Sequence, residues 1–159
     1  MVKSKKIVIL LMALTICFGQ VKQDTATVDH FKTRKFNVVI FPASYYWKSE
    51  QKFTPTRQEV EKAEKALRKQ LKALNKHLFH QEEPPIIHKN LKKYIRHYYG
   101  YIDQEGHRIL EIHCFWEQSV QEYDWLEPLL VFDGGSHFWN VKYNLDTGVL
   151  FDLEVNGVA

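Results

Sequence analysis

The chain has 159 residues, of which 45% are hydrophobic and 14% aromatic, enough apolar material for one domain with its own core. The formal net charge is +3 at pH 7. Of the 22 Lys and Arg residues, three lie in the first 19 residues, which contain no acid. The rest of the chain therefore carries 19 basic and 19 acidic side chains, and this balance removes the main argument for a nucleic-acid partner.

The first 19 residues have the pattern of a secretory signal peptide. Lysines at positions 3, 5 and 6 precede an apolar stretch, Ile7 to Phe18. This stretch is shorter than the roughly 20 apolar residues that span a bilayer. We therefore expect an exported protein (periplasmic, at the cell surface or secreted) with no transmembrane segment in the mature chain.

Cleavage is predicted before Gln20, because the small residues Cys17 and Gly19 then occupy positions −3 and −1. A lipid anchor on Cys17 is the weaker alternative. Lipoprotein processing favours a small residue just before the cysteine, whereas Ile16 is large and β-branched. The mature chain would retain Cys114 alone, so it could form no intramolecular disulfide and would depend on its core.

Charge is sorted along the chain. Residues 57–99 carry eleven basic and five acidic side chains, whereas residues 103–156 carry two basic and eleven acidic ones. Such a dipolar protein can present a basic helix face and an acidic sheet face to different partners. The simpler interpretation, which we prefer here, is that both faces are solvated, because helix surfaces are commonly charged.

After the leader, residues 20–35 are polar and aperiodic and predict a mobile N-terminal segment, followed by a single domain over residues 36–159. This domain begins with the apolar run from Phe36 to Phe41, which ends at Pro42 and is typical of a buried strand. The aromatic-rich residues 43–53 are either an irregular continuation of that strand or a loop.

One long helix is the clearest predicted element. Thr56 and Glu59 have the spacing of a capping box, in which each side chain bonds a backbone amide of the first turn. An apolar stripe of helical spacing then continues for about five turns and must stop before Pro84. The stripe consists of Val60, Ala63, Leu67, Leu71, Leu74 and Leu78. A single stripe buries a single face, so we expect a sheet beneath the helix.

The rest of the chain is strand-like. Residues 94–102 and 107–117 flank a turn at 103–106, and residues 138–143 and 149–155 flank a turn at 144–148, which predicts two hairpins. Another apolar run, residues 129–132, ends at Asp133-Gly134-Gly135-Ser136, whose glycines favour a turn or bulge.

Alternation along two of these strands predicts which residues share a face. In residues 107–117 we expect Leu110, Ile112, Cys114 and Trp116 to face the helix, opposite Ile109, Glu111, His113 and Phe115. In the last strand we expect Val149, Phe151, Leu153 and Val155 on one face, opposite Leu150, Asp152 and Glu154.

Together these elements predict an α+β fold, with one long helix packed on a curled antiparallel sheet of four to six strands. The segment from Phe138 to Leu150 resembles the terminal hairpin of PepSY-type exported domains, and the element order is similar to the cystatin-like and NTF2-like architectures. The cystatin inhibitory motif Gln-x-Val-x-Gly does not occur in the chain. The resemblance therefore implies export and a fold, and leaves the function open.

The predicted end of the helix carries two histidines with metal-ligand spacing. His77 and His80 have the i,i+3 spacing of two ligands of one metal, with Glu82, Glu83 and His88 close behind. A histidine at a helix C-terminus is equally explained by the negative end of the helix dipole. We predict neither a metal nor a cofactor, with His77 and His80 as weak candidates.

Two other constellations have structural explanations. His113 and Cys114 are adjacent on a strand and so point to opposite faces, which excludes a thiol–imidazole pair. Asp133, Ser136 and His137 lie close in sequence, but a catalytic triad is defined by geometry and not by sequence distance. We interpret Cys114 as a core residue and the segment from Asp133 to His137 as a turn.

Adjacent large rings on the predicted strands are the strongest functional signal. They place aromatic side chains on both faces of a sheet for which a single covering helix is predicted. We therefore expect part of the set Tyr99, Tyr101, Phe115 and Trp139 to form an exposed patch that binds a partner or stacks on a flat ligand. The sheet could also enclose both sets of rings, or loops could cover them.

The leading hypothesis is a non-enzymatic, exported binding module for a protein, glycan or small-molecule ligand. Its candidate ligand-binding residues are Tyr99, Tyr101, Phe115, Trp139, Asp133 and His137. One alternative is an NTF2-like enzyme that uses acid/base residues such as Asp133 and His137 in a sheet pocket. Another is a secreted inhibitor or immunity protein whose acidic region meets a basic partner.

Overall fold

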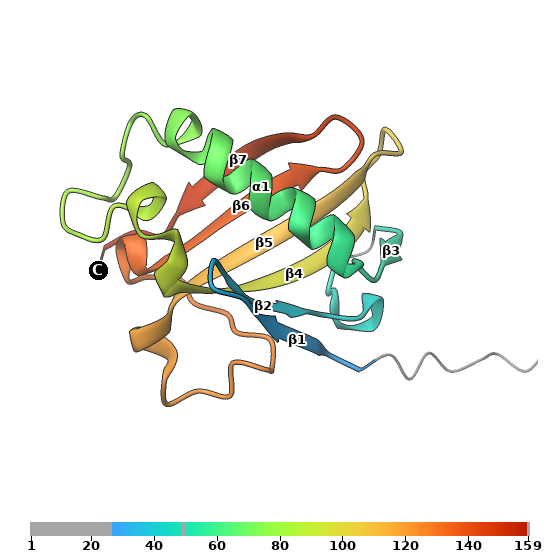
Figure 1. Cartoon of the computed structure of the whole chain (residues 1–159), viewed down its shortest axis with the longest axis horizontal. Helices are drawn as coiled ribbons and strands as arrows, with labels where there is room; N and C mark the ends of the chain where they lie inside the picture. The colour runs from blue at the N-terminus through green and yellow to red at the C-terminus, as the bar shows by residue number, and fades with distance from the viewer. Residues whose placement is uncertain (1–26, 49, 159) are drawn as a thin grey trace, which may run out of the picture.

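The computed structural model describes residues 27–48 and 50–158, which form an α+β fold with one α-helix and a seven-stranded, mostly antiparallel sheet (Figure 1). The strands are β1 (Asp29–Lys32), β2 (Asn37–Ile40), β3 (Lys52–Phe53), β4 (Tyr94–Ile102), β5 (Arg108–Trp116), β6 (Phe138–Asn144) and β7 (Val149–Val155), and the helix is α1 (Arg57–Leu74). The order across the sheet is β1-β2-β4-β5-β6-β7, and β3 pairs with the far end of β4. The path runs from one edge to the other, so the sheet is open.

Two strands run parallel, which corrects the expectation of an antiparallel sheet. Asn37 to Ile40 of β2 pair in parallel register with Ile95 to Tyr98 of β4. Parallel neighbours need a long crossover connection, and α1 lies within the connection between these two strands. The long helix therefore explains the parallel pair.

The N-terminal strand corrects a second expectation. Residues 20–35 were predicted to be mobile, but Asp29–Lys32 form β1 and pair antiparallel with β2. Asp29 also accepts two hydrogen bonds from the guanidinium of Arg57 at the start of α1, at 2.6 and 2.8 Å. The polar composition of this segment reflects a strand at the sheet edge. The predicted leader lies outside the described residues.

The capping box at the start of α1 is confirmed. The amide of Glu59 donates to the hydroxyl of Thr56 at 3.3 Å, and the amide of Thr56 donates to the carboxylate of Glu59 at 2.9 Å. Leu67 and Leu71 are buried, as the stripe predicts. The helix ends at Leu74, however, and Leu78 lies beyond it with a positive φ and a side chain that is 37% exposed.

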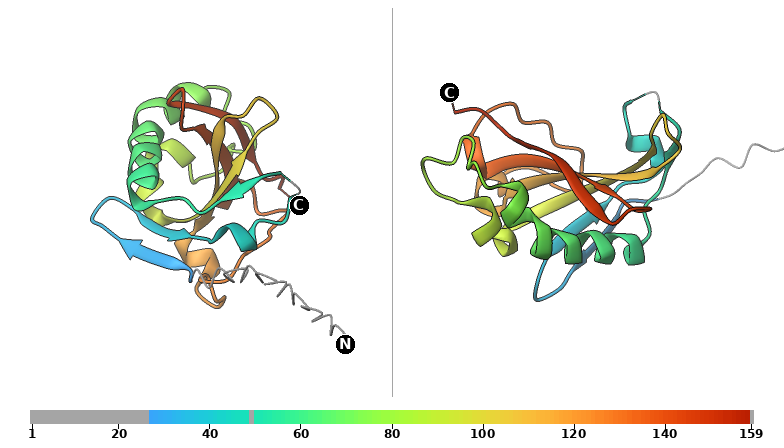
Figure 2. Two further views of the ribbon diagram at one scale, coloured as in Figure 1. Left: turned by 90° about the vertical axis from the view of Figure 1, so that its right-hand side faces the viewer. Right: turned by 90° about the horizontal axis from the view of Figure 1, so that it is seen from above.

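The sheet is covered on both faces. Between α1 and the sheet lies a first core that includes Leu67, Leu71, Tyr98, Ile112 and Trp139. The opposite face carries a second core, which two irregular segments cover: residues 43–47 after β2 and residues 120–131 after β5. Figure 2 shows α1 on one side of the curved sheet and these segments on the other. Loops, not a second helix, form the third layer.

The alternation predicted for β5 is confirmed. Leu110, Ile112 and Cys114 belong to the first core, with Trp116 packed against it, whereas Ile109 and Phe115 belong to the second. Cys114 is thus a buried core residue, separated from His113 by the sheet. Burial raises the pKa of its thiol well above the ordinary value.

The alternation predicted for β7 is wrong, because the strand contains a bulge. Between the pairs Asn140–Glu154 and Lys142–Phe151 the register slips by one residue, and Asp152 takes a positive φ of 53°. Leu150, Leu153 and Val155 consequently face the first core, while Phe151 packs against the second. Strict alternation does not anticipate one extra residue.

The apolar run at residues 129–132 forms no strand. Leu129 and Val131 pack against the second core, whereas Leu130 and Phe132 are 69% and 81% exposed. The turn predicted after this run is confirmed, since Gly134 and Gly135 both have positive φ values, of 87° and 54°.

A basic pocket as the candidate functional site

The four residues expected to supply an exposed aromatic patch are all buried, so that expectation is wrong. Tyr99, Tyr101 and Phe115 lie in the second core and are 1%, 8% and 4% exposed, and Trp139 is 1% exposed in the first core. The loops after β2 and β5 cover the face that we expected to be open. The assignment of these residues as ligand contacts stays a prediction, now without an exposed surface to support it.

Asp133 and His137 border different hollows. Asp133 is exposed and lies beside Leu130 and Phe132, whereas His137 lies beside His80 and Glu82. The ring of His137 packs edge-on against Trp116 at 5.6 Å. In the part of the chain that the structure describes, no three His, Cys, Asp or Glu side chains are grouped so as to hold a metal ion.

A buried polar cluster that the sequence did not reveal lies on the loop-covered face. The carboxylate of Glu111 accepts hydrogen bonds from the hydroxyl of Tyr46 at 2.7 Å and from Lys48 Nζ at 2.9 Å, and lies 3.1 Å from His113 Nε2. Burial disfavours ionisation of Glu111, but the hydrogen bonds from His113, Lys48 and Tyr46 outweigh it and lower its pKa to about 2. The cluster ties the loop after β2 to the sheet.

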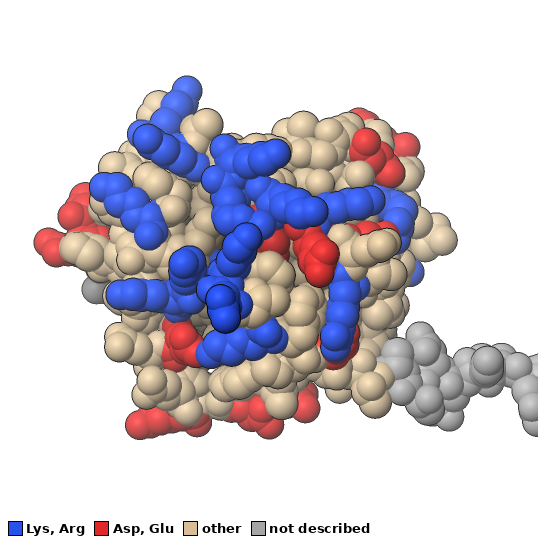
Figure 3. Space-filling view, viewed as in Figure 1, with Lys and Arg blue, Asp and Glu red and all other residues tan. Residues whose placement is uncertain are grey.

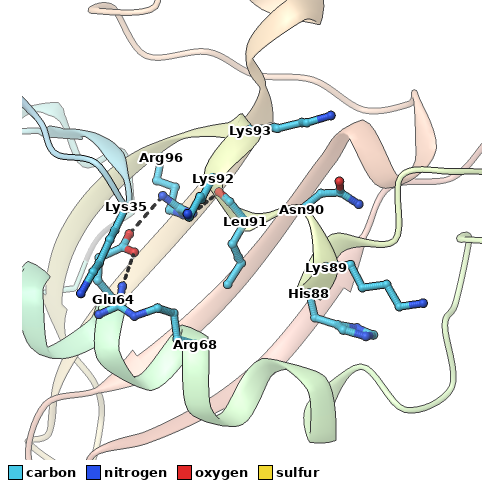
Figure 4. Close-up of a pocket in the computed structure, with 10 residues that line it drawn as sticks. All are labelled: Lys35, Glu64, Arg68, His88, Lys89, Asn90, Leu91, Lys92, Lys93 and Arg96. Atoms are coloured by element: carbon cyan, nitrogen blue, oxygen red, sulfur yellow. Dashed lines mark hydrogen bonds and ion pairs between the residues drawn. The ribbon is translucent and has the colours of Figure 1, made fainter.

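A hollow lies on the helix side of the molecule, between α1, the turn after β1 and the segment that leads into β4. Its volume is about 470 Å³. Lys35, Glu64, Arg68, His88, Lys89, Asn90, Leu91, Lys92, Lys93 and Arg96 line it (Figure 4). We call it the basic pocket, because six of these residues are Lys or Arg and one is acidic.

A buried ion pair lies at the base of the basic pocket. Arg96 and Glu64 are 0% and 1% exposed, and Arg96 Nη1 is 3.3 Å from Glu64 Oε1. Glu64 also accepts a 2.9 Å hydrogen bond from the hydroxyl of Tyr98 and lies 3.7 Å from Arg68. Burial raises the pKa of the Glu64 carboxyl, against the opposing effects of Arg96, Tyr98 and Arg68.

Arg96 has unused hydrogen-bonding capacity. Its Nη2 donates to the carbonyl of Leu91, but Nε and Nη1 have no hydrogen-bond acceptor within the described residues, although Nη1 is close to Glu64. A guanidinium carries five N–H donors, and buried donors without a partner are costly. Figure 4 shows Arg96 deep in the basic pocket, between β4 and α1. Its Nε, which has neither a hydrogen bond nor an ion pair among the described residues, therefore marks a place for an acceptor.

The rim of the basic pocket is cationic. Lys35, Arg68, Lys89 and Lys92 are exposed around it, and Lys and Arg side chains gather over this face of the molecule (Figure 3). Burial lowers the pKa of His88, and the positive charges of Lys89 and Lys72 lower it further. The field of the pocket therefore favours anions.

Sequence reasoning missed Glu64 and Arg96 for identifiable reasons. Glu64 and Arg96 both fall within the charge-rich residues 57–99, whose charges we interpreted as a solvated face. One signal was present: Tyr94, Arg96 and Tyr98 alternate on one strand, which places an arginine on the same face as two large rings. A charge on a core face predicts a buried partner.

No protein-family model, curated protein or solved structure matches this chain. The resemblances to PepSY-type and NTF2-like domains therefore rest on the sequence pattern alone. None of the helices that the structure describes combines the length and the apolar character needed to cross a membrane.

Proposed function

We propose that this protein is an exported, non-enzymatic binding module that holds an anionic group, such as a phosphate or carboxylate, in the basic pocket. The observation that carries the proposal is the fully buried Arg96 at the base of the pocket, whose Nε has no hydrogen-bond acceptor among the residues that the structure describes. An anion there accepts a hydrogen bond from Nε of the guanidinium, which is a strong, charge-assisted interaction.

The charges around Arg96 support the same function. Glu64 offsets part of the charge of Arg96, but the exposed cations Lys35, Arg68 and Lys92 remain at the rim. Lys93 contributes less, because its amine lies over the ring of Trp116, 5.3 Å from the centroid. Arginine provides a planar fork for phosphate or carboxylate, and lysines act as point charges. The pocket thus combines one fixed donor group with several mobile ones.

The contacts of the acid and the histidine in the basic pocket favour ligand binding over catalysis. Glu64 is the one carboxylate among the described residues that line the basic pocket, and Tyr98, Arg96 and Arg68 already engage it. His88 Nδ1 lies 3.1 Å from the side-chain amide nitrogen of Asn75, and this contact fixes the imidazole ring of His88. Glu64 and His88 therefore serve to hold the walls of the basic pocket in place.

Calorimetric titration with inorganic phosphate in a phosphate-free buffer tests the proposal. Lys35→Ala and Arg68→Ala should each weaken binding about fivefold, the range expected for a partly exposed charge contact, and added salt should weaken it further. Lys62→Ala and Lys76→Ala are matched controls, because both lysines are exposed and neither lines the pocket. Equal effects in variants and controls, or no phosphate binding by the unmodified protein, would overturn the proposal.

Arg96→Lys tests the buried donor itself. It keeps the charge near Glu64 but removes the planar fork, so we expect weaker phosphate binding with a smaller loss of stability than truncation would cause. An unfolding curve recorded on the same sample shows whether the variant is folded. Unchanged phosphate affinity in a folded Arg96→Lys protein would show that Arg96 does not contact the anion.

A further inference from the structure

A second basic hollow adjoins the basic pocket. Its volume is about 360 Å³, and it is lined by Thr33, Arg34, Lys35, Phe36, Glu61, Lys65 and Arg68. Lys35 and Arg68 also line the basic pocket, so the two hollows meet at these two side chains. We call the two hollows together the basic groove. It runs from Arg96 past Arg68 to Lys65, along the face of α1.

The basic groove has more positive charge than one small anion needs. The two hollows contain eight Lys or Arg side chains and two acids, Glu61 and Glu64. Glu64 is buried and pairs with Arg96 and Arg68, and Glu61 is exposed, so the cations of the groove outnumber its acids by six. Arg34, Lys35, Lys65 and Arg68 are all exposed. A ligand with several negative charges in series would engage the groove along its length.

The lining of the groove favours recognition by charge over stacking. Among the described residues that line the two hollows, Phe36 is the one Phe, Tyr or Trp, and it is 8% exposed. Single-stranded nucleic acids are commonly held by rings on which bases stack, and glycans by exposed Tyr and Trp. Lysine amines and guanidinium edges instead suit phosphate oxygens.

We propose that the basic groove binds a linear chain of phosphate groups, with one phosphate on Arg96 and later phosphates on Lys35, Arg68 and Lys65. This inference rests on the proposed function, because it places the first phosphate in the basic pocket. Inorganic polyphosphate and a phosphodiester-linked polymer such as poly(glycerol phosphate) share the required chemistry.

The test compares inorganic phosphate with polyphosphate of increasing length on the full-length protein. We expect affinity per chain to rise at least about tenfold from inorganic phosphate to a chain that fills both hollows, and the dependence of log affinity on log salt to steepen by about 0.7 for each further phosphate neutralised. Poly(glycerol phosphate) as a separate arm distinguishes the two sources. A uronate polymer of equal charge should bind more weakly.

Variants separate this inference from the proposed function. Lys65→Ala should weaken polyphosphate binding severalfold and leave inorganic phosphate binding unchanged, because Lys65 lines the second hollow alone. Lys62→Ala, on the same helix but outside both hollows, is the control. If phosphate binds with dependence on Arg68 but polyphosphate gains nothing in affinity or salt slope, the groove is wrong and the pocket stands. If the uronate polymer binds as tightly as polyphosphate, the assignment to phosphate is wrong. If inorganic phosphate does not bind, both proposals fail.

Discussion

The hydroxyl of Tyr46 donates a 2.7 Å hydrogen bond to the carboxylate of Glu111, and so joins the loop after β2 to the middle of β5. With His113 and Lys48 as further partners, Glu111 has a pKa of about 2 although it is largely buried. A carboxyl whose pKa is lowered by folding binds fewer protons in the folded state. Its stabilising contribution is therefore present above its unfolded pKa, near 4.5, and is lost as the pH falls toward 2.

Glu111→Gln should accordingly be less stable than the unmodified protein at pH 6, by about 2 kcal/mol after allowance for solvent screening. The gap should shrink as the pH falls below 4.5 and close only below about pH 2, where the Glu111 carboxyl of the folded protein is itself protonated. Urea unfolding at several pH values measures it. Glu122→Gln, at an exposed position, is the control. A gap that stays constant with pH would contradict the assignment.

Truncation of the helix stripe should be costly. Leu67 and Leu71 are 1% and 0% exposed in the first core, so Leu67→Ala or Leu71→Ala should reduce the free energy of unfolding by roughly 2–5 kcal/mol through lost burial and a residual cavity. Denaturant unfolding of each variant provides the measurement. Leu130→Ala, at a side chain 69% exposed, should change stability by about 0.5 kcal/mol or less. Similar small changes at all three positions would place α1 away from the sheet.

The loop-covered face can be tested in the same way. Phe115→Ser and Tyr101→Ser should each destabilise the protein by about 3 kcal/mol or more, because both rings are buried in the second core. Phe132→Ser is the matched control at a ring that is 81% exposed. Chemical unfolding curves suffice. Near-zero effects at Phe115 and Tyr101 would restore the open aromatic surface expected from the sequence.

The buried ion pair predicts a non-additive pair of substitutions. Arg96→Met leaves the carboxylate of Glu64 without its buried partner and should cost about 3–5 kcal/mol. Adding Glu64→Leu removes the uncompensated charge, so the double variant should recover a large part of that loss. Strictly additive losses in the unfolding free energies would show that the two side chains do not interact.

Export is tested outside the described residues. The basic n-region, the short apolar stretch and the small residues at −3 and −1 predict a mature chain that begins at Gln20. N-terminal sequencing of protein recovered from the cell envelope or medium gives the answer directly. A retained Met1 would contradict export, and a lipid on Cys17 would replace cleavage before Gln20 with anchoring.

Local signals in the sequence predicted much of the fold. The capping box at Thr56, the hairpin turns and the alternation in β5 depend on residues close together in the chain, and the structure has them where the pattern placed them. The bulge at Asp152 and the burial of Tyr99 depend on the register of β7 and on which loops fold over the sheet. Such tertiary contacts are not encoded in the hydrophobic alternation of a single strand, so the sequence pattern did not predict them.

The basic pocket was hidden for a similar reason. Lys35, Arg68 and Arg96 come from a turn, the helix and a strand, and the chain folds them around one hollow. Their charges were visible in the sequence, but the basic stretch was interpreted as a solvated helix face. What distinguishes Arg96 is its burial, and this follows from the packing of α1 on β4.

An anion bound in the basic pocket as we propose would compete with Glu64 for two guanidinium groups, those of Arg68 and Arg96. Arg68 and Arg96 partly offset the effect of burial on the Glu64 carboxyl, whose pKa nevertheless lies above the ordinary value. An anion that draws these cations to itself, and adds its own negative charge, raises that pKa further. Binding would then be accompanied by proton uptake at Glu64, and the affinity for the proposed anion would fall as the pH rises through the range in which Glu64 ionises. Through Glu64, the anion binding that we propose for the basic pocket would be linked to pH.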